Sequence, residues 1–256
     1  MTGTTELHIE GPVASIVFNR PDARNAMTWT MYEELEKACH AIENNASIRV
    51  VSLRGAGGKA FISGTDIAQF SDFKHGSDGV RYERQITNYV GAVANLPVPT
   101  IGIIEGWAVG GGMAIASVCD FRIATPGTRF GVPIAKTLGN CLSAANLGAL
   151  VSTLGLPMVK RMLLLAEMIN AEEMTDSGFV HEIVAVESLE DRVRDMVDHL
   201  INHAPITLLA TKNLLNRINE CTVKDEDLIA QVYGSDDFHE GVDAFINKRL
   251  PQWKGK

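Results

Sequence analysis

Three consecutive glycines, Gly110 to Gly112, stand between two apolar stretches of the chain. The apolar run at residues 100–104 predicts a strand, and the apolar residues after the glycines predict a short helix. Glycine lets a backbone N–H group approach a ligand closely, and the N-terminus of a helix carries partial positive charge. The pattern therefore predicts an oxyanion hole, in which backbone N–H groups bind negative charge that develops on a carbonyl oxygen. Taken alone, the glycines fit tight packing between a helix and a strand equally well.

The triple-glycine segment is one of four stretches that together indicate a known family. The others are VFNRPDARNAM at residues 17–27, GGKAFISGTDI at residues 57–67 and HEGVDAFINKRLPQW at residues 239–253. In order and spacing, the four stretches resemble the enoyl-CoA hydratase/isomerase (crotonase) superfamily over nearly the whole chain. The resemblance implies an α/β fold, a crotonase-like spiral of ββα units, with residues 239–253 as the last helix of a C-terminal helical segment. It also implies a homotrimer, or a hexamer built as a dimer of trimers, in which this segment packs on neighbouring subunits.

The resemblance also implies where a substrate binds. The backbone N–H groups of Thr65 and Gly111 would hold the carbonyl oxygen of a coenzyme A (CoA) thioester. Cations at Arg24 and Lys248 suit the phosphates of CoA in a chain that is otherwise acidic. Each side chain also has an ordinary structural interpretation, such as a surface charge, a helix cap or a packing residue. Contacts to the acyl-CoA substrate are expected from Arg24, Ser63, Gly64, Asp66, Ile67, Trp107, Gly110, Ala114, Pro133, Ile134, Phe245 and Lys248.

The catalytic positions depart from the family pattern. Hydratases of the family use two glutamates that share a water molecule and act as general acid and general base. In this chain the first position is Ala114, and the second is Ile134, or Ala135 if one extra residue precedes Leu138. None of these side chains can transfer a proton, so the sequence excludes hydration by two glutamates.

Other polar residues are candidates to replace the missing glutamates. Asn140 and Ser143 are the candidate catalytic side chains in a stretch that also contains Cys141 and Asn146. The structural alternatives are a turn at Asn140, a helix cap at Ser143 and a buried thiol at Cys141. Glu105 and Lys136 are better explained as structural or solvated charges. The variable segment that lines acyl pockets in the family contributes Asp72, His75, Glu83 and Arg84.

Three functions are compatible with these residues. The first is an acyl-CoA-processing enzyme that stabilises a thioester enolate with backbone N–H groups, for decarboxylation, isomerisation, C–C cleavage or hydrolysis. The second is a weak hydratase in which Asp72 or Glu83 orients the water. The third is a noncatalytic subunit that binds a CoA thioester or supports an assembly. We expect no cofactor beyond the CoA moiety of the substrate.

The composition limits the other possibilities. A net charge of −8 and a pI near 5.4 argue against a nucleic-acid-binding surface. Four scattered cysteines (Cys39, Cys119, Cys141 and Cys221) form no C-x-x-C pair, so we predict no metal site and a reducing compartment. Residues 1–10 lack a leader pattern, and no run of about 18 apolar residues predicts a membrane span. We therefore expect a cytoplasmic protein without membrane or nucleic-acid partners.

The predicted site depends on alternating strands and helices. Apolar runs predict strands at residues 13–18, 50–53, 100–104 and 121–124. Helical spacing predicts a helix over about residues 31–42, with Thr28 or Thr30 as its cap. Further helices are predicted at residues 81–96, 143–154, 157–166, 187–203 and 205–219. A composition shift near residue 190 predicts a core domain over residues 1–190 and a helical segment over residues 191–256.

Overall fold

A computed structural model describes residues 3–219 and 226–253 of the chain. Its strands are β1 (Thr4–Glu10), β2 (Val13–Asn19), β3 (Val50–Gly55), β4 (Thr100–Ile104), β5 (Trp107–Val109), β6 (Phe121–Ala124), β7 (Arg129–Gly131), β8 (Ile169–Asn170) and β9 (Glu182–Ile183). Six of them form a sheet in the order β1–β2–β3–β4–β6–β9, and β5–β7–β8 form a second, smaller sheet. In the larger sheet β1 and β2 are antiparallel, while all the other neighbours are parallel.

The four predicted strands are present as β2, β3, β4 and β6. β1 was not predicted, because most of its residues are partly or fully exposed and the strand contains few apolar residues. It is instead held by its pairing with β2, whose register runs from Thr4 opposite Asn19 to Glu10 opposite Val13. Pairing of this kind leaves little signal in the hydrophobic pattern of the strand itself.

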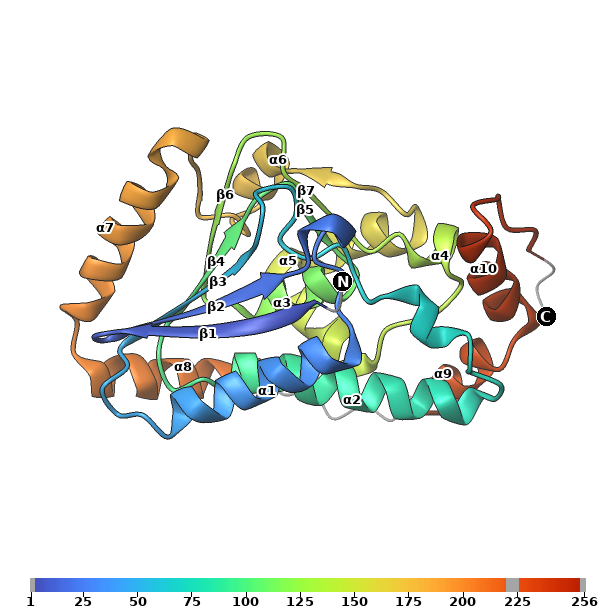
Figure 1. Cartoon of the computed structure of the whole chain (residues 1–256), viewed down its shortest axis with the longest axis horizontal. Coiled ribbons are helices and arrows are strands. Elements are labelled where there is room, and N and C mark those ends of the chain that lie inside the picture. The colour runs from blue at the N-terminus through green and yellow to red at the C-terminus, as the bar shows by residue number, and fades with distance from the viewer. Residues whose placement is uncertain (1–2, 220–225, 254–256) are drawn as a thin grey trace.

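Helices α1 (Trp29–Glu43) and α2 (Gly76–Ala94) lie side by side along one face of the larger sheet (Figure 1). Of the two predicted caps, Thr28 and Thr30, it is Thr28 that caps α1, by accepting a hydrogen bond from the N–H of Met31 at 3.3 Å. α2 begins at Gly76 instead of residue 81, because Asp78 accepts hydrogen bonds from the N–H groups of Lys74 and His75 at 2.9 and 3.0 Å. This cap fixes the start of a helix that contributes to the site.

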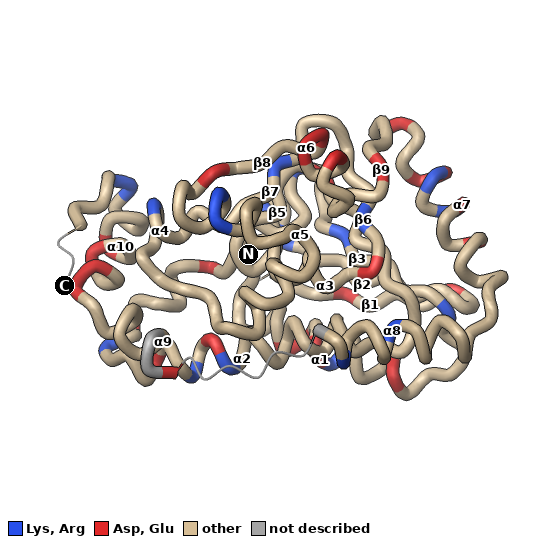
Figure 2. The backbone as a smooth tube through the Cα atoms, turned by 180° about the vertical axis from the view of Figure 1, so that it is seen from behind, with Lys and Arg blue, Asp and Glu red and all other residues tan. Residues whose placement is uncertain are grey.

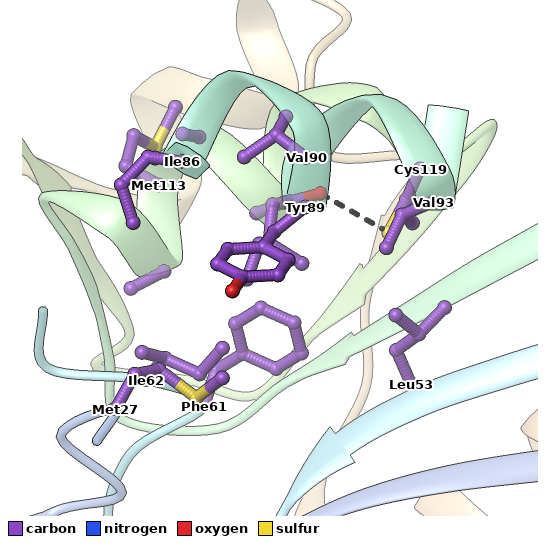
Figure 3. Packing of buried hydrophobic residues seen from close by; sticks show 14 of the residues in the cluster. Met27, Leu53, Phe61, Ile62, Ile86, Tyr89, Val90, Val93, Met113 and Cys119 are labelled. Atoms are coloured by element: carbon purple, nitrogen blue, oxygen red, sulfur yellow. Dashed lines mark hydrogen bonds between the residues drawn. The ribbon is translucent and has the colours of Figure 1, made fainter. Parts of the chain in front are cut away.

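The larger sheet is covered on both faces. On one face, Val51 and Leu53 pack with α1, α2 and α3 (Gly111–Val118). On the other face, Val50 and Ile101 pack against α7 (Leu189–Ile201). Figure 3 shows part of the first cluster, in which side chains from α2 and α3 lie around Phe61. A strand that is buried on both faces is a continuous apolar run in the sequence, which is why β3 and β4 could be predicted.

Helix α5 (Ala144–Leu164) combines the two helices predicted at residues 143–154 and 157–166. They meet at Gly155, whose φ of 72° and ψ of 153° are not helical, and Pro157 follows. Among the described residues, α5 is the one helix that is long and apolar enough to cross a membrane by length and composition. The break at Gly155 leaves two shorter pieces, whereas a spanning helix needs about 20 continuous residues. The expectation of no membrane span therefore stays our prediction.

The C-terminal helices approach the site from the N-terminal end of α2. α9 (Glu226–Tyr233) lies along α2, and α10 (Asp236–Ile246) packs on the short helix η2 (Ile67–Phe70) (Figure 1). The last helix was predicted over residues 239–253, but α10 begins earlier and ends at Ile246, and Lys248 has a φ of 53°.

The predicted boundary at residue 190 falls at the start of α7 and stays a prediction, and Cys221 lies outside the described residues. The remaining helices are η1 (Pro21–Ala23), α4 (Ile134–Thr137), α6 (Ala171–Asp176), η3 (Val186–Ser188) and α8 (Pro205–Asn219).

Charged residues of both signs are distributed over the described elements (Figure 2). Around α7, for example, Arg192 pairs with Glu182 at 2.6 Å and Arg194 pairs with Asp191 at 3.2 Å. Figure 2 shows Lys and Arg segments separated by Asp and Glu segments, and the chain as a whole has a net charge of −8. That nucleic acid is not a partner remains an expectation from this charge distribution.

Candidate active site

Two loops bring the predicted oxyanion donors together. Ile62 and Ala108 form an isolated parallel bridge, in which the N–H of Val109 donates to the carbonyl of Ile62 at 2.9 Å. Thr65 lies three residues after Ile62, and Gly111 lies three residues after Ala108. The loops stay close up to this point, since a Cβ atom added to Gly110 would lie 3.7 Å from the Cα of Gly64. The bridge therefore sets the two donors in register.

Among the described residues, the N–H groups of Thr65 and Gly111 have no hydrogen-bond acceptor outside the regular elements. Gly110 has a φ of 55° and precedes α3, so Gly111 is the first residue of that helix. Neighbouring N–H groups are paired: that of Asp66 with Met27 at 2.8 Å and that of Gly110 with Gly131 at 3.0 Å. Within residues 3–219 and 226–253, no backbone or side-chain hydrogen bond outside the regular elements uses the N–H of Thr65 or Gly111. Both donors are therefore available to a ligand.

A cavity of about 350 Å³ lies against these donors. Its apolar wall includes Phe70 and Ile86 and the two positions without carboxylates, Ala114 and Ile134. The predicted site residues that line it are Ser63, Gly64, Thr65, Asp66, Ile67, Gly110, Gly111, Ala114, Pro133, Ile134, Asn140 and Phe245. A mostly apolar cavity beside these two N–H groups can hold an acyl group with its carbonyl oxygen at the donors.

Four predicted site residues do not line this cavity: Arg24, Trp107, Lys248 and Ser143. Arg24 is exposed and lies over the ring of Trp107, with its guanidinium carbon 5.9 Å from the ring centroid. Lys248 is exposed just beyond the end of α10. The hydroxyl of Ser143 accepts a hydrogen bond from the N–H of Asn146 at 3.2 Å and so caps α5. The structural interpretation therefore describes Ser143 better than the catalytic one.

Sequence reasoning missed a cation in the cavity wall. Arg20 lines the cavity, forms an ion pair with Asp66 at 2.8 Å and donates to the carbonyl of Ala26 at 3.1 Å. Asp66 in turn caps η2 by accepting from the N–H of Ala68 at 3.2 Å. The signal that could have identified Arg20 is its place at the carboxyl end of β2, the edge at which α/β sheets bind ligands.

One carboxylate of the variable segment lies in the cavity wall. Glu83 is 1% exposed, and its carboxylate accepts hydrogen bonds from the Tyr233 hydroxyl and from the Ser143 N–H, each at 2.7 Å. A carboxylate can only accept, so the Tyr233 hydrogen points at Glu83, and the amide of Asn140 must donate to the Tyr233 oxygen, at 3.1 Å. The Asn140 amide oxygen is left buried without a partner among the described residues. Burial raises the pKa of Tyr233 well above 10, and the charge of Glu83 adds to this effect.

The other proposed substitutes lie elsewhere. Asp72 and His75 are exposed and outside the cavity wall, and Arg84 pairs with Glu226 at 2.5 Å. Cys141 is partly buried, and Asn146 is buried in the first turn of α5. Glu105 forms a largely buried ion pair with Arg54 at 2.9 Å, and Lys136 is exposed on α4, as their structural interpretations predict. Among the described residues, no cluster of three or more His, Cys, Asp or Glu side chains could hold a metal ion.

A family model described as enoyl-CoA hydratase/isomerase matches residues 8–256. The chain belongs to this family. Among curated members, it is 29% identical over 248 residues to the short-chain-enoyl-CoA hydratase of Clostridium acetobutylicum, covering 95% of this chain and 94% of that protein. It is 27% identical to the crotonyl-CoA hydratase of Syntrophomonas wolfei, covering 98% and 97% of the two chains. The predicted family is thus confirmed.

Solved structures show the same fold. A methylmalonyl-CoA decarboxylase in complex with 2-nitronate-propionyl-CoA superposes with a TM-score of 0.90 at 27% identity, covering 99% of both chains. The predicted fold class, a crotonase-like α/β core with a C-terminal helical segment, is therefore confirmed as well. The similarity extends to proteins named for different activities, a hydratase and a decarboxylase, so membership of the family leaves the reaction open.

Proposed function

We propose that the protein is an acyl-CoA-processing enzyme that binds a thioester oxygen with the N–H groups of Thr65 and Gly111 and stabilises the resulting enolate. The observation that supports this proposal most directly is the pair of unused backbone donors in register at the wall of one cavity. Backbone donors of this kind typically contribute about 3–4 kcal/mol each to stabilising the transition state. The proposal requires no cofactor beyond the CoA moiety of the substrate.

The cavity favours reactions that need an enolate but no pair of carboxylates. Ala114 and Ile134 present hydrocarbon to the cavity and cannot exchange protons. Decarboxylation fits this wall: the bond from the α-carbon to a carboxylate breaks, CO₂ leaves, and the electron pair enters the thioester as an enolate. One proton then returns to the α-carbon from solvent. The decarboxylase among the structural neighbours supports testing this reaction first.

Hydration is the second candidate, and the position of Glu83 favours it. This buried carboxylate lines the cavity and could orient a water molecule. In hydration, the water oxygen bonds to the β-carbon of an enoyl thioester and a proton is added to the α-carbon. With one carboxylate in place of two, we expect this reaction to be slow.

A panel of acyl-CoAs followed by mass spectrometry separates these possibilities. Methylmalonyl-CoA should lose CO₂, whereas crotonyl-CoA should gain water only slowly, and hydrolysis would release free CoA. Glu83→Gln keeps the shape of the side chain, so it should abolish any hydration while leaving decarboxylation nearly unchanged. Binding of every thioester without turnover would instead indicate the noncatalytic subunit. If no acyl-CoA binds, the proposed function is wrong.

A further inference from the structure

Three hydroxyl groups form a chain beside the two N–H groups. Oγ1 of Thr65 lies 2.9 Å from the hydroxyl oxygen of Tyr32 and 2.9 Å from that of Tyr82. The chain also touches the start of α3, because a Cβ atom added to Gly111 would lie 2.6 Å from the Tyr32 oxygen and 3.5 Å from Thr65 Oγ1. The hydroxyls therefore lie between the two loops that supply the predicted donors.

Packing fixes both tyrosine rings. Tyr32 is completely buried and stacks on Tyr89, with ring centroids 5.3 Å apart. Tyr82 is 6% exposed and packs edge-on against Phe70, with centroids 4.9 Å apart. Burial raises the pKa of Tyr32 and Tyr82 well above 10, and for Tyr82 the neighbouring Tyr32 and Glu83 add to the effect. Both hydroxyls therefore remain protonated at neutral pH and can donate hydrogen bonds.

The number of hydrogens decides what the chain can do. Three hydroxyls carry three hydrogens, but two hydrogen bonds connect them, so one hydrogen must point elsewhere. If Tyr32 kept this hydrogen, it would point into the packed interior, and an unpaired buried donor costs about 1–3 kcal/mol. Thr65 and Tyr82 line the cavity, whereas Tyr32 does not. The spare hydrogen is therefore best placed on the cavity side of the chain.

We propose that Tyr82 presents its hydroxyl hydrogen to the bound acyl group, as a third donor beside the N–H groups of Thr65 and Gly111. Tyr32 acts as a positioning residue: it donates to Thr65, Thr65 donates to Tyr82, and the Tyr82 hydrogen turns to the cavity. This inference rests on the proposed function, because it needs a thioester or enolate oxygen in the cavity. A neutral donor stabilises the enolate without giving up its proton, so no proton transfer is required.

The kinetic test compares Tyr82→Phe with Tyr89→Phe. Each variant removes one hydroxyl from α2, but Tyr89 does not line the cavity, and no hydrogen bond among the described residues uses its hydroxyl. With the acyl-CoA that the panel shows to react, Tyr82→Phe should lower kcat and kcat/KM together by about 10²–10³-fold, the usual effect of removing one oxyanion donor. Tyr89→Phe should leave both constants unchanged.

A spectroscopic test separates hydrogen bonding from changes in packing, and it works even without turnover. The probe is butyryl-CoA with an isotope-labelled carbonyl, whose infrared stretching frequency falls when the oxygen accepts hydrogen bonds. The wild-type protein should lower this frequency, and Tyr82→Phe should reverse part of the shift. Thr65→Val keeps the backbone N–H but removes the hydroxyl, so it should act in the same direction and serves if Tyr82→Phe does not fold.

The outcomes distinguish this inference from the proposed function. A folded Tyr82→Phe variant with unchanged kcat and an unchanged carbonyl frequency would overturn the role of Tyr82 while the proposed function stands. If the wild-type protein neither binds butyryl-CoA nor reacts with the panel, the proposed function fails, and the role of Tyr82 fails with it.

Discussion

Gly111→Ala tests the oxyanion hole by adding a single methyl group. The added Cβ would lie 2.6 Å from the Tyr32 hydroxyl oxygen, whereas ordinary contacts begin at 3.4 Å, so one side must move by roughly 0.8 Å. Tyr32 has little room to retreat, because it is completely buried, stacks on Tyr89 and is hydrogen-bonded to Thr65. The displacement therefore falls largely on the first turn of α3, which carries the N–H of Gly111.

The expected loss follows from this displacement. Misplacing a reacting group by about 1 Å costs about 10²-fold in rate, close to the about 10²–10³-fold cost of losing an oxyanion donor. We therefore expect kcat of Gly111→Ala to fall by about 10²-fold, which corresponds to about 2.7 kcal/mol of transition-state stabilisation. Gly111→Val adds more bulk and should abolish turnover or acyl-CoA binding while the fold stays assembled.

Tyr32→Phe tests whether the clash with the Tyr32 hydroxyl causes this loss. It removes the oxygen that clashes, and the ring carbon that carried it lies 3.9 Å from the added Cβ, an ordinary contact. In the Tyr32→Phe background, Gly111→Ala should therefore cost less than about tenfold, which a double-mutant cycle measures directly. Gly91→Ala is the control, because a Cβ at this α2 glycine meets nothing within 4 Å. It should keep wild-type activity.

The assay is steady-state turnover of the reactive acyl-CoA, with thermal unfolding of each variant as a check on folding. Wild-type kcat in Gly111→Ala would refute the placement of the second donor. If Gly111→Ala lowers kcat equally in the wild-type protein and in the Tyr32→Phe variant, the clash with the Tyr32 hydroxyl is not the cause of the loss.

Three further predictions concern the rest of the molecule. Hydration of crotonyl-CoA, measured at steady state, should be several orders of magnitude slower than in two-glutamate enzymes, because acid–base groups contribute about 10²–10⁴-fold each. A hydration rate as high as in those enzymes would contradict this prediction. If Glu83→Gln abolished that rate, Glu83 would be the substitute carboxylate. Light scattering should report a trimer or hexamer and not a 27.8 kDa monomer, because Ile206 and Ile218 of α8 are 79% and 78% exposed. The free energy of unfolding should fall as the pH rises from about 9 towards 12. Burial raises the pKa of Cys39 and Cys119 from 9.0 to about 12. In this pH range the folded state therefore keeps thiol protons that the unfolded state releases. Denaturant titrations at pH 8 and pH 10 measure the slope, which should be smaller in Cys39→Ala with Cys119→Ala.

The parts of the site that backbone atoms form could be predicted from the sequence. Glycines at residues 110–112 mark a close approach of the backbone, and the Ser63–Asp66 loop marks the second approach. The structure brings both loops to one cavity through a short parallel bridge. Local sequence is enough here, because the chain conformation itself sets the position of an N–H group.

Side-chain partners could not be predicted in the same way. The hydroxyl of Tyr233 reaches Glu83 from 150 residues away, and nothing in the local pattern of either residue indicates the pairing. Arg20 and Arg24 show a related difficulty, since they are only four residues apart and both are basic. A 3-10 turn over Pro21–Ala23 separates them, so Arg20 faces Asp66 in the cavity wall while Arg24 lies over Trp107 outside it.

The carboxylates of the cavity wall bear on whether the cavity is better suited to proton transfer or to stabilising an enolate. Among the described residues that line the cavity, these carboxylates are Asp66 and Glu83. Asp66 forms an ion pair with Arg20. Glu83 accepts hydrogen bonds from the Tyr233 hydroxyl and the Ser143 N–H. A proton taken from a substrate would have to compete with these partners, whereas no described residue competes for the N–H groups of Thr65 and Gly111 outside the regular elements. The wall is therefore better suited to hold an enolate than to move protons, and this difference is the physical reason to test decarboxylation before hydration.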